Sequence, residues 1–176
     1  MCLAWCAFVG WWAFGRDERI PLLAFVNLGF HELGHLACYL VPVVGTVVTA
    51  SAGSVMQCLV PVGLALYFLA WRRDRLAAAA CLAWAAGNFQ EAAVYIADAP
   101  FQQLQLIGGE HDWATVLGPE HLDRLQDAGS IAGTVRGAGV VVLVMAVVLA
   151  LVTLAMSGSR RDGSGRRDDV DERFPV

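Results

Sequence analysis

The sequence is poor in charged residues and contains no lysine. Charged residues make up 16% of the chain, against about 25% in a typical soluble domain. All 12 basic residues are arginines, and the formal net charge is −4. The chain has no basic patch and no arginines interleaved with aromatic residues, so we expect no nucleic-acid partner.

The cysteines also lack a pairing pattern. Their number is odd, no two form a Cys-x-x-Cys motif, and most lie in apolar segments: Cys2, Cys6, Cys38, Cys58 and Cys81. We interpret them as small buried hydrophobic residues.

The chain is rich in apolar residues. Hydrophobic residues make up 57% of it, and the mean hydropathy is +0.57. Clusters of charge divide the chain into five expected membrane spans, at about 1–15, 20–41, 54–71, 76–99 and 131–156. We therefore predict an all-α membrane protein with one polytopic domain over residues 1–156. An outer loop would cover residues 100–130, and a disordered cytoplasmic tail residues 157–176.

The segment between the second and third spans has a different composition. Residues 43–54 are β-branched and glycine-rich, and they are too few to cross a bilayer. They predict either a re-entrant strand or hairpin, or an ordinary extracytoplasmic loop.

The positions of the arginines predict the orientation. Arginines gather at residues 72–75 and 160–167, so we expect both segments in the cytoplasm. If the chain changes sides at each expected span, residues 16–19 also lie in the cytoplasm and the N-terminus lies outside. The mostly acidic residues 100–130 then lie outside.

A His-Glu-Leu-Gly-His motif occupies residues 31–35 within the apolar run Ile20–Val41. On a helix, His31 and His35 share one face and can bind one Zn²⁺, while Glu32 is placed to take a proton from metal-bound water. Ionisable residues are costly at membrane depth, which favours a functional site. The alternative is that these residues only form hydrogen bonds between helices.

A zinc hydrolase needs a third protein ligand and an open fourth position. We favour His111, because neutral imidazole is a good zinc donor and the glycines at 108–109 could turn it toward the metal. Asp112 would then orient His111. Asp98, Asp112 and Glu91 are the alternative ligands, Glu91 because of its depth in the fourth span.

Two further residues are candidates for supporting roles. Gln57, in the third span, could hold a peptide carbonyl or steady an oxyanion, or it could simply bond to another helix. Gly34, inside the motif, would keep that helix face open.

The order of these elements resembles the core of the site-2-protease class of intramembrane zinc metalloproteases. The resemblance covers about residues 20–100, and only the H-E-x-x-H element is specific. It implies a third ligand that maps to Asp98, although Ala97-Asp98-Ala99 departs from the motif of that family. The chain is also similar to small bacterial multi-pass proteins with an H-E-x-x-H motif, so we expect an integral protein of a bacterial plasma membrane.

The sequence therefore predicts a membrane-embedded zinc metallopeptidase. Its substrates would be peptides or membrane proteins cleaved in or near the bilayer, with Glu32 as the base. The alternative is a non-enzymatic metal-binding membrane protein, a carrier or a sensor, that uses the same His pair. A third hypothesis, an iron oxidase, usually needs more histidines than the four present.

Overall fold

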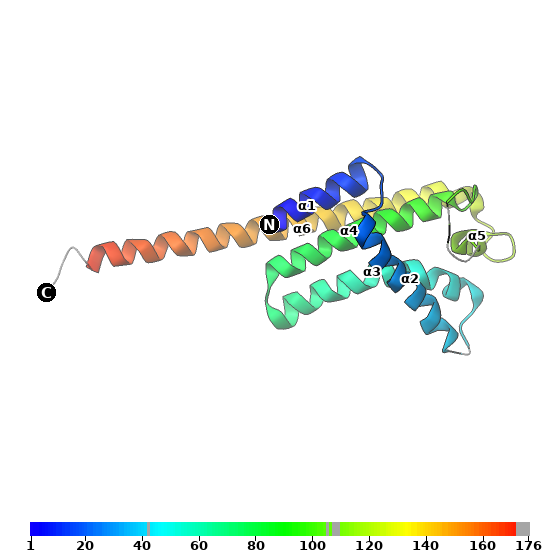
Figure 1. Ribbon diagram of the computed structural model, residues 1–176, viewed down its shortest axis with the longest axis horizontal. Helices are drawn as coiled ribbons and strands as arrows, with labels where there is room; N and C mark the ends of the chain where they lie inside the picture. Colours follow the sequence, from blue (N-terminus) through cyan, green and yellow to red (C-terminus); the bar gives the residue numbers. More distant parts are fainter. Residues whose placement is uncertain (42, 105, 107–109, 172–176) are drawn as a thin grey trace.

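The computed structural model describes residues 1–41, 43–104, 106 and 110–171, with side chains as far as residue 157. Every regular element in these residues is helical, which confirms the predicted all-α class (Figure 1). The α-helices are α1 (Cys2–Val9), α2 (Pro21–Tyr39), α3 (Thr46–Tyr67), α4 (Arg75–Asp98), α5 (Asp112–Leu117) and α6 (Ala128–Asp171). Helices α1 and α3 each continue into a π-helical turn, which ends at Gly15 and Arg72 respectively.

Helix α4 forms the centre of the bundle. It packs against α1, α3 and α6, while α2 lies across α3 (Figure 1). Most of its buried residues are alanines, and Gly139 of α6 packs against it so closely that an added Cβ would lie 2.9 Å from the Cβ of Phe89. Small residues let helices approach where dispersion forces, and not burial from water, hold them together.

Two helical segments are long and apolar enough to cross a membrane, Thr46–Arg72 and Leu125–Ser157. A third apolar helix, Cys2–Gly15, is shorter. The prediction of five spans is therefore not supported. Helices α2 and α4 have the length of a span, but polar residues reduce their apolarity: Asn27, His31, Glu32 and His35 in α2, and Asn88, Gln90 and Glu91 in α4.

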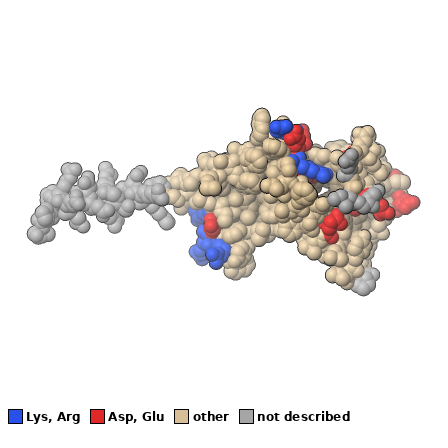
Figure 2. Space-filling view, in the orientation of Figure 1, with Lys and Arg blue, Asp and Glu red and all other residues tan. Residues whose placement is uncertain are grey.

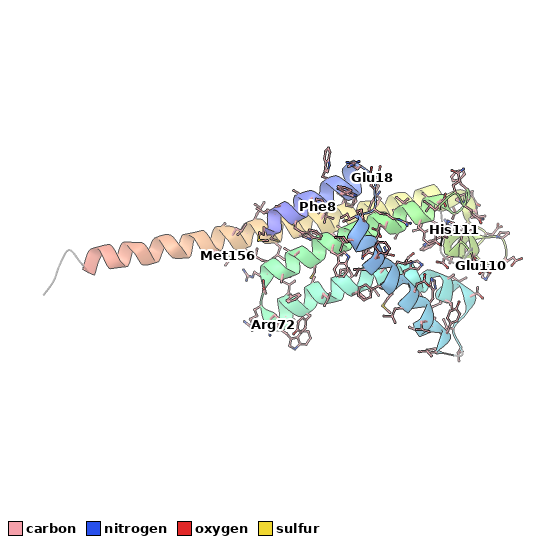
Figure 3. The ribbon with its side chains drawn as sticks, in the orientation of Figure 1. Phe8, Glu18, Arg72, Glu110, His111 and Met156 are labelled. Atoms are coloured by element: carbon pink, nitrogen blue, oxygen red, sulfur yellow. The ribbon has the colours of Figure 1, made fainter. Side chains whose placement is uncertain are left out.

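The surface of the two long helices suits a lipid environment. Large apolar side chains of α6 are about half exposed, among them Val141, Val144, Val148 and Leu151. On the face shown in Figure 2, charged side chains gather in a few places, and uncharged surface lies between them. These places match the positions of Arg72, Glu18 and Glu110 in Figure 3.

Helix α1 runs parallel to α4, which the sequence did not predict. Cys2 Sγ donates to the carbonyl of Leu76, Trp5 Nε1 to that of Ala80, and Gln90 Nε2 to Asp17, at sequence separations of 74, 75 and 73. The N-terminus therefore lies at the same end of the bundle as the α3–α4 turn. Residues 16–19 lie about 20 Å from that end, at 1.5 Å per residue.

This arrangement corrects part of the predicted topology. Residues 16–19 were expected on the same side as 72–75, and the N-terminus on the opposite side. A count of arginines cannot detect that Asp17 is held in place by Arg136 of α6, at 2.7 Å. The contact of Arg75 Nη1 with Met156 Sδ, at 3.3 Å, places the end of the last apolar segment beside residues 72–75, as expected. Which side is cytoplasmic stays a prediction.

Two other segments differ from expectation. Residues 46–54 form the first turns of α3, so both predicted alternatives, a re-entrant strand or hairpin and an ordinary loop, are wrong for these residues. Their packing on α2 outweighs β-propensity: a Cβ on Gly34 would overlap the backbone carbonyl of Ala52. Helix α6 continues to Asp171 where disorder was predicted, because extending an existing helix is far easier than starting one. Residues 172–176 of the predicted tail lie outside the described residues.

Candidate metal centre

The two histidines of the motif face one point on the side of α2. Their ring centroids are 4.9 Å apart, and both side chains are largely buried. A spacing of four residues on a helix produces this proximity, as the sequence predicts. Gly34, one residue before His35, is buried in the contact with α3 and brings the imidazoles against that helix.

Asp112, the first residue of α5, completes a group of three residues that could hold a metal ion. Its Oδ2 lies 3.0 Å from His31 Nε2 and 3.3 Å from His35 Nε2, and the possible ligand atoms of the three residues all lie within 4.8 Å of one another. Two ligands bound to zinc at about 2.1 Å and a tetrahedral angle are roughly 3.4 Å apart. The two distances from Asp112 Oδ2 are close to this value, which suits a metal ion shared with each histidine.

Hydrogen bonds fix the orientation of two of these ligands. His35 Nδ1 bonds to the carbonyl of Thr49 at 2.8 Å, so Nδ1 carries a proton and Nε2 is the ring nitrogen that a metal would bind. The Tyr95 hydroxyl donates to Asp112 Oδ2 at 3.2 Å and accepts from the Asp112 backbone amide at 3.0 Å. Helix α4 thus holds the start of α5 against the His pair.

Gly53 of α3 leaves room at the ligand atoms. A Cβ at this position would lie 2.5 Å from His31 Nε2 and 2.6 Å from His35 Nε2. Any side chain would therefore occupy the region in which a shared metal ion has to lie. The free space beside Gly53, which we call the cradle, and the donor set of two imidazoles and a carboxylate both fit zinc.

The carboxyl of Asp112 is stabilised in its charged form. Burial opposes its ionisation, but the hydrogen bond with His31 and the nearby His35 outweigh this effect and lower the pKa of Asp112 below its usual value. The hydrogen bond requires a proton on His31 Nε2, and a divalent cation would replace that proton between the same two atoms.

His111, the third ligand favoured from the sequence, has a different position. It is the N-cap of α5: its Nδ1 accepts from the Ala114 amide at 3.2 Å. Its Nε2 lies 3.3 Å from Asp98 Oδ2, without the geometry of a hydrogen bond. Figure 3 shows His111 and Glu110 at the α5 end of the bundle. The expected turn at 108–109 lies outside the described residues.

The structure therefore places these two neighbours differently from the favoured prediction, in which His111 was the ligand and Asp112 oriented it. Asp112 joins the His pair, and His111 caps the helix that carries Asp112. The reason is local: His111 is extended, whereas Asp112 begins the helix, so the two side chains leave the backbone in different directions. Asp98 instead accepts from the amides of Gln103 and Leu104, so the position implied by the family resemblance is used to close a loop.

Glu91 and Gln57 belong to a separate polar group. Glu91 Oε2 accepts from Gln57 Nε2 at 2.8 Å and from Asn27 Nδ2 at 3.0 Å. Glu91 is thus not part of the three-ligand group, and Gln57 bonds to another helix, the simpler of its two predicted roles.

Sequence reasoning did not assign roles to Thr49, Gly53 or Tyr95. No sequence signal marks Thr49 or Tyr95, because each acts through hydrogen bonds to a residue far away in the chain. The signal for Gly53 was the glycine-rich composition of residues 43–54, which was interpreted as a loop or a strand. A small residue facing a metal-binding helix was the better interpretation.

A cavity of about 450 Å³ opens at the three ligands. Glu32, His31 and His35 line it together with Gln57, Glu91, Tyr95 and Asp112. Glu32 is exposed to this cavity, and its carboxylate accepts no hydrogen bond from the described residues. A second cavity, of about 400 Å³, adjoins the first and also contacts His35 and Asp112. Space is therefore available on two sides of the candidate metal centre.

Comparison with protein-family models, with curated proteins and with solved structures finds no match to this chain. Any function must therefore be inferred from the chemistry of the residues themselves.

Proposed function

We propose that this protein is a membrane-bound zinc peptidase that hydrolyses peptide bonds at the α5 end of its helical bundle. The observation that carries the proposal is the placement of Asp112 within 3.3 Å of both His31 Nε2 and His35 Nε2, with Glu32 on the same cavity. Two His and one carboxylate, with a Glu next to the first His, are the usual components of a zinc hydrolase.

Each residue has a defined task in this proposal. His31, His35 and Asp112 would hold the zinc, which supplies an activated water and polarises the scissile carbonyl. Glu32 takes the proton from the attacking water and passes it to the leaving amine. Tyr95 and Thr49 hold two of the ligands in position through the hydrogen bonds described above.

The membrane location is supported by the two apolar segments and by their exposed valines and leucines. Helices α1, α2 and α4 would pack around these two segments. The metal centre lies beside Tyr95, three residues before α4 ends, and not halfway along that helix. We therefore place the reaction near one surface of the membrane.

The resemblance to the site-2-protease class supports the type of reaction and not the ligand set. The H-E-x-x-H element is common to both, whereas the third ligand proposed here follows the last helix of the resembling region. Peptide hydrolysis is the reaction that this motif most often supports on a helix.

The test is a comparison of zinc content and hydrolysis in detergent-purified protein. Wild type should bind one zinc ion and cleave a library of internally quenched peptides, and a chelator should abolish cleavage. Glu32→Gln should keep the zinc and lose hydrolysis by about 10²-fold or more, because only the base is removed. Glu18→Gln is the matched control, because Glu18 pairs with Arg16 on the surface at 2.8 Å.

Two results would contradict the proposal. Loss of zinc from Glu32→Gln would show that Glu32 is a ligand and not a base. A wild-type protein that binds one zinc ion but cleaves no peptide would favour the carrier or sensor hypothesis.

A further inference from the structure

Glu91 uses only one of its two carboxylate oxygens in hydrogen bonds to the described residues. The side-chain amides of Asn27 and Gln57 both donate to Oε2, at 3.0 and 2.8 Å. The described residues provide no hydrogen bond to Oε1, and Glu91 lines the same cavity as His31 and His35. A carboxylate whose only task was to connect helices would be expected to use both oxygens.

The donors to Oε2 are themselves fixed. Trp84 Nε1, which can only donate, bonds to Asn27 Oδ1 at 2.8 Å, so the NH₂ group of Asn27 has to face Glu91. Gln57 is also held in place, because its backbone carbonyl accepts a hydrogen bond from Asn88 Nδ2. The network thus comes from three helices and sets the position of a carboxylate that lines the cavity.

The charge of the cavity wall favours a cationic occupant. Four carboxylates line it, against the single guanidinium of Arg19: Glu32, Glu91, Glu110 and Asp112. A bound zinc ion would offset two of these negative charges, at the end of the cavity nearest Asp112. Glu91 would remain as a negative group at a distance from the metal.

The offset between Glu91 and Tyr95 along α4 suits a basic side chain. Glu91 precedes Tyr95 by one turn of α4, and Tyr95 bonds to Asp112. Four residues correspond to about 6 Å along the helix. An ammonium group on a chain of four or five methylenes covers this distance from a peptide bond held at the metal.

We propose that Glu91 determines specificity by binding the ammonium or guanidinium group of a basic residue next to the hydrolysed bond. This inference rests on the proposed zinc peptidase function and names the substrate class of that site. Glu91 contacts the substrate and takes no part in proton transfer. Asn27 and Gln57 are positioning residues that act through Glu91.

The test measures inhibitor binding and does not depend on turnover. The probes are two hydroxamates that bind zinc through the same group, one with a six-carbon aminoalkyl arm and one with a neutral alkyl arm of equal length. Their dissociation constants are measured on the zinc-loaded, full-length protein in detergent. Wild type should bind the amine probe at least about tenfold more tightly, the order expected for one charge-assisted hydrogen bond.

Substitutions then assign the preference to Glu91. Glu91→Gln keeps an acceptor for Asn27 and Gln57 but removes the charge, so the two probes should bind within about twofold of each other, with zinc content unchanged. Glu91→Asp keeps the charge on a shorter side chain and should retain part of the preference. Glu18→Gln removes the same charge outside the cavity and should retain all of it.

Each remaining outcome overturns the inference in a recognisable way. Equal affinities in wild type would mean that Glu91 offers no charge to the substrate, and this result needs no variant to fold. A preference that survives in Glu91→Gln would mean that another carboxylate is responsible. Failure of both probes to bind, or absence of zinc, would overturn the proposed function and this inference together.

Discussion

Substitution of Gly53 by alanine is the most direct test of the metal centre. The new methyl group would lie 2.5 Å from His31 Nε2 and 2.6 Å from His35 Nε2. Ordinary contact between such atoms needs about 3.5 Å, so each imidazole has to move by roughly 1 Å. A metal site tolerates deviations of about 0.2 Å in its bond lengths.

The expected loss follows from this displacement. With both imidazoles displaced, we expect zinc affinity to fall by at least 100-fold, which corresponds to about 2.7 kcal/mol. Overpacking at a tight helix contact should also destabilise the fold, by about 1–3 kcal/mol. Gly53→Ala should therefore lose its zinc in a competition with a chelator and unfold at a lower temperature than wild type.

Gly63 provides the matched control on the same helix. A Cβ at Gly63 has no atom within 4 Å, so Gly63→Ala should bind zinc like wild type. It should also be more stable by about 0.5–1 kcal/mol, because alanine favours a helix. The assays are zinc content by mass spectrometry, zinc affinity by competition and thermal unfolding without metal. Wild-type zinc affinity in Gly53→Ala would refute the assignment of the metal to this cradle.

Three further predictions concern the ligands and the topology. Asp112→Ala should lose zinc about as completely as His35→Ala. His111→Ala should keep His31, His35 and Asp112 as ligands and should mainly reduce the stability of α5. If His111→Ala lost as much zinc as Asp112→Ala while α5 stayed intact, His111 would again be a candidate ligand. Tyr95→Phe should weaken zinc binding by about 10–100-fold, as expected when a ligand loses its orienting hydrogen bond, and an unchanged affinity would contradict that role. Labelling of single cysteines introduced at Asp74 and Ser157 should show one side of the membrane and at Gln103 the other; Gln103 on the same side as Asp74 would contradict the arrangement of α4 and α6.

The helical content and the His pair could be predicted from the sequence, because both depend on local periodicity. Apolar segments bounded by charge indicate helices, and a spacing of four residues brings His31 and His35 together whatever surrounds them. The residue that joins the His pair could not be predicted in this way. Its identity depends on how α5 docks on α4, which is decided by two hydrogen bonds between Asp112 and Tyr95, 17 residues apart.

The topology was predicted incompletely for a related reason. The arginine rule treats each loop as lying on one side or the other of the membrane. Residues 16–19 lie partway along the bundle in this fold, because α1 runs parallel to α4 and Asp17 bonds to Gln90 and Arg136. Side-chain contacts between distant segments decided this position, and no count of charges records them.

Under the proposed function, the depth of the candidate metal centre limits which bonds can reach it. Tyr95 lies three residues from one end of α4 and 20 residues from the other, distances of about 5 Å and 30 Å along the helix. Gly53 lies seven residues after the start of α3, or about 10 Å. Both helices thus place the centre close to the end of the bundle that carries α5. A substrate bond need only enter the outer part of the bundle to meet Glu32, so a membrane-protein substrate would be cut near the end of its span and not at the bilayer midplane.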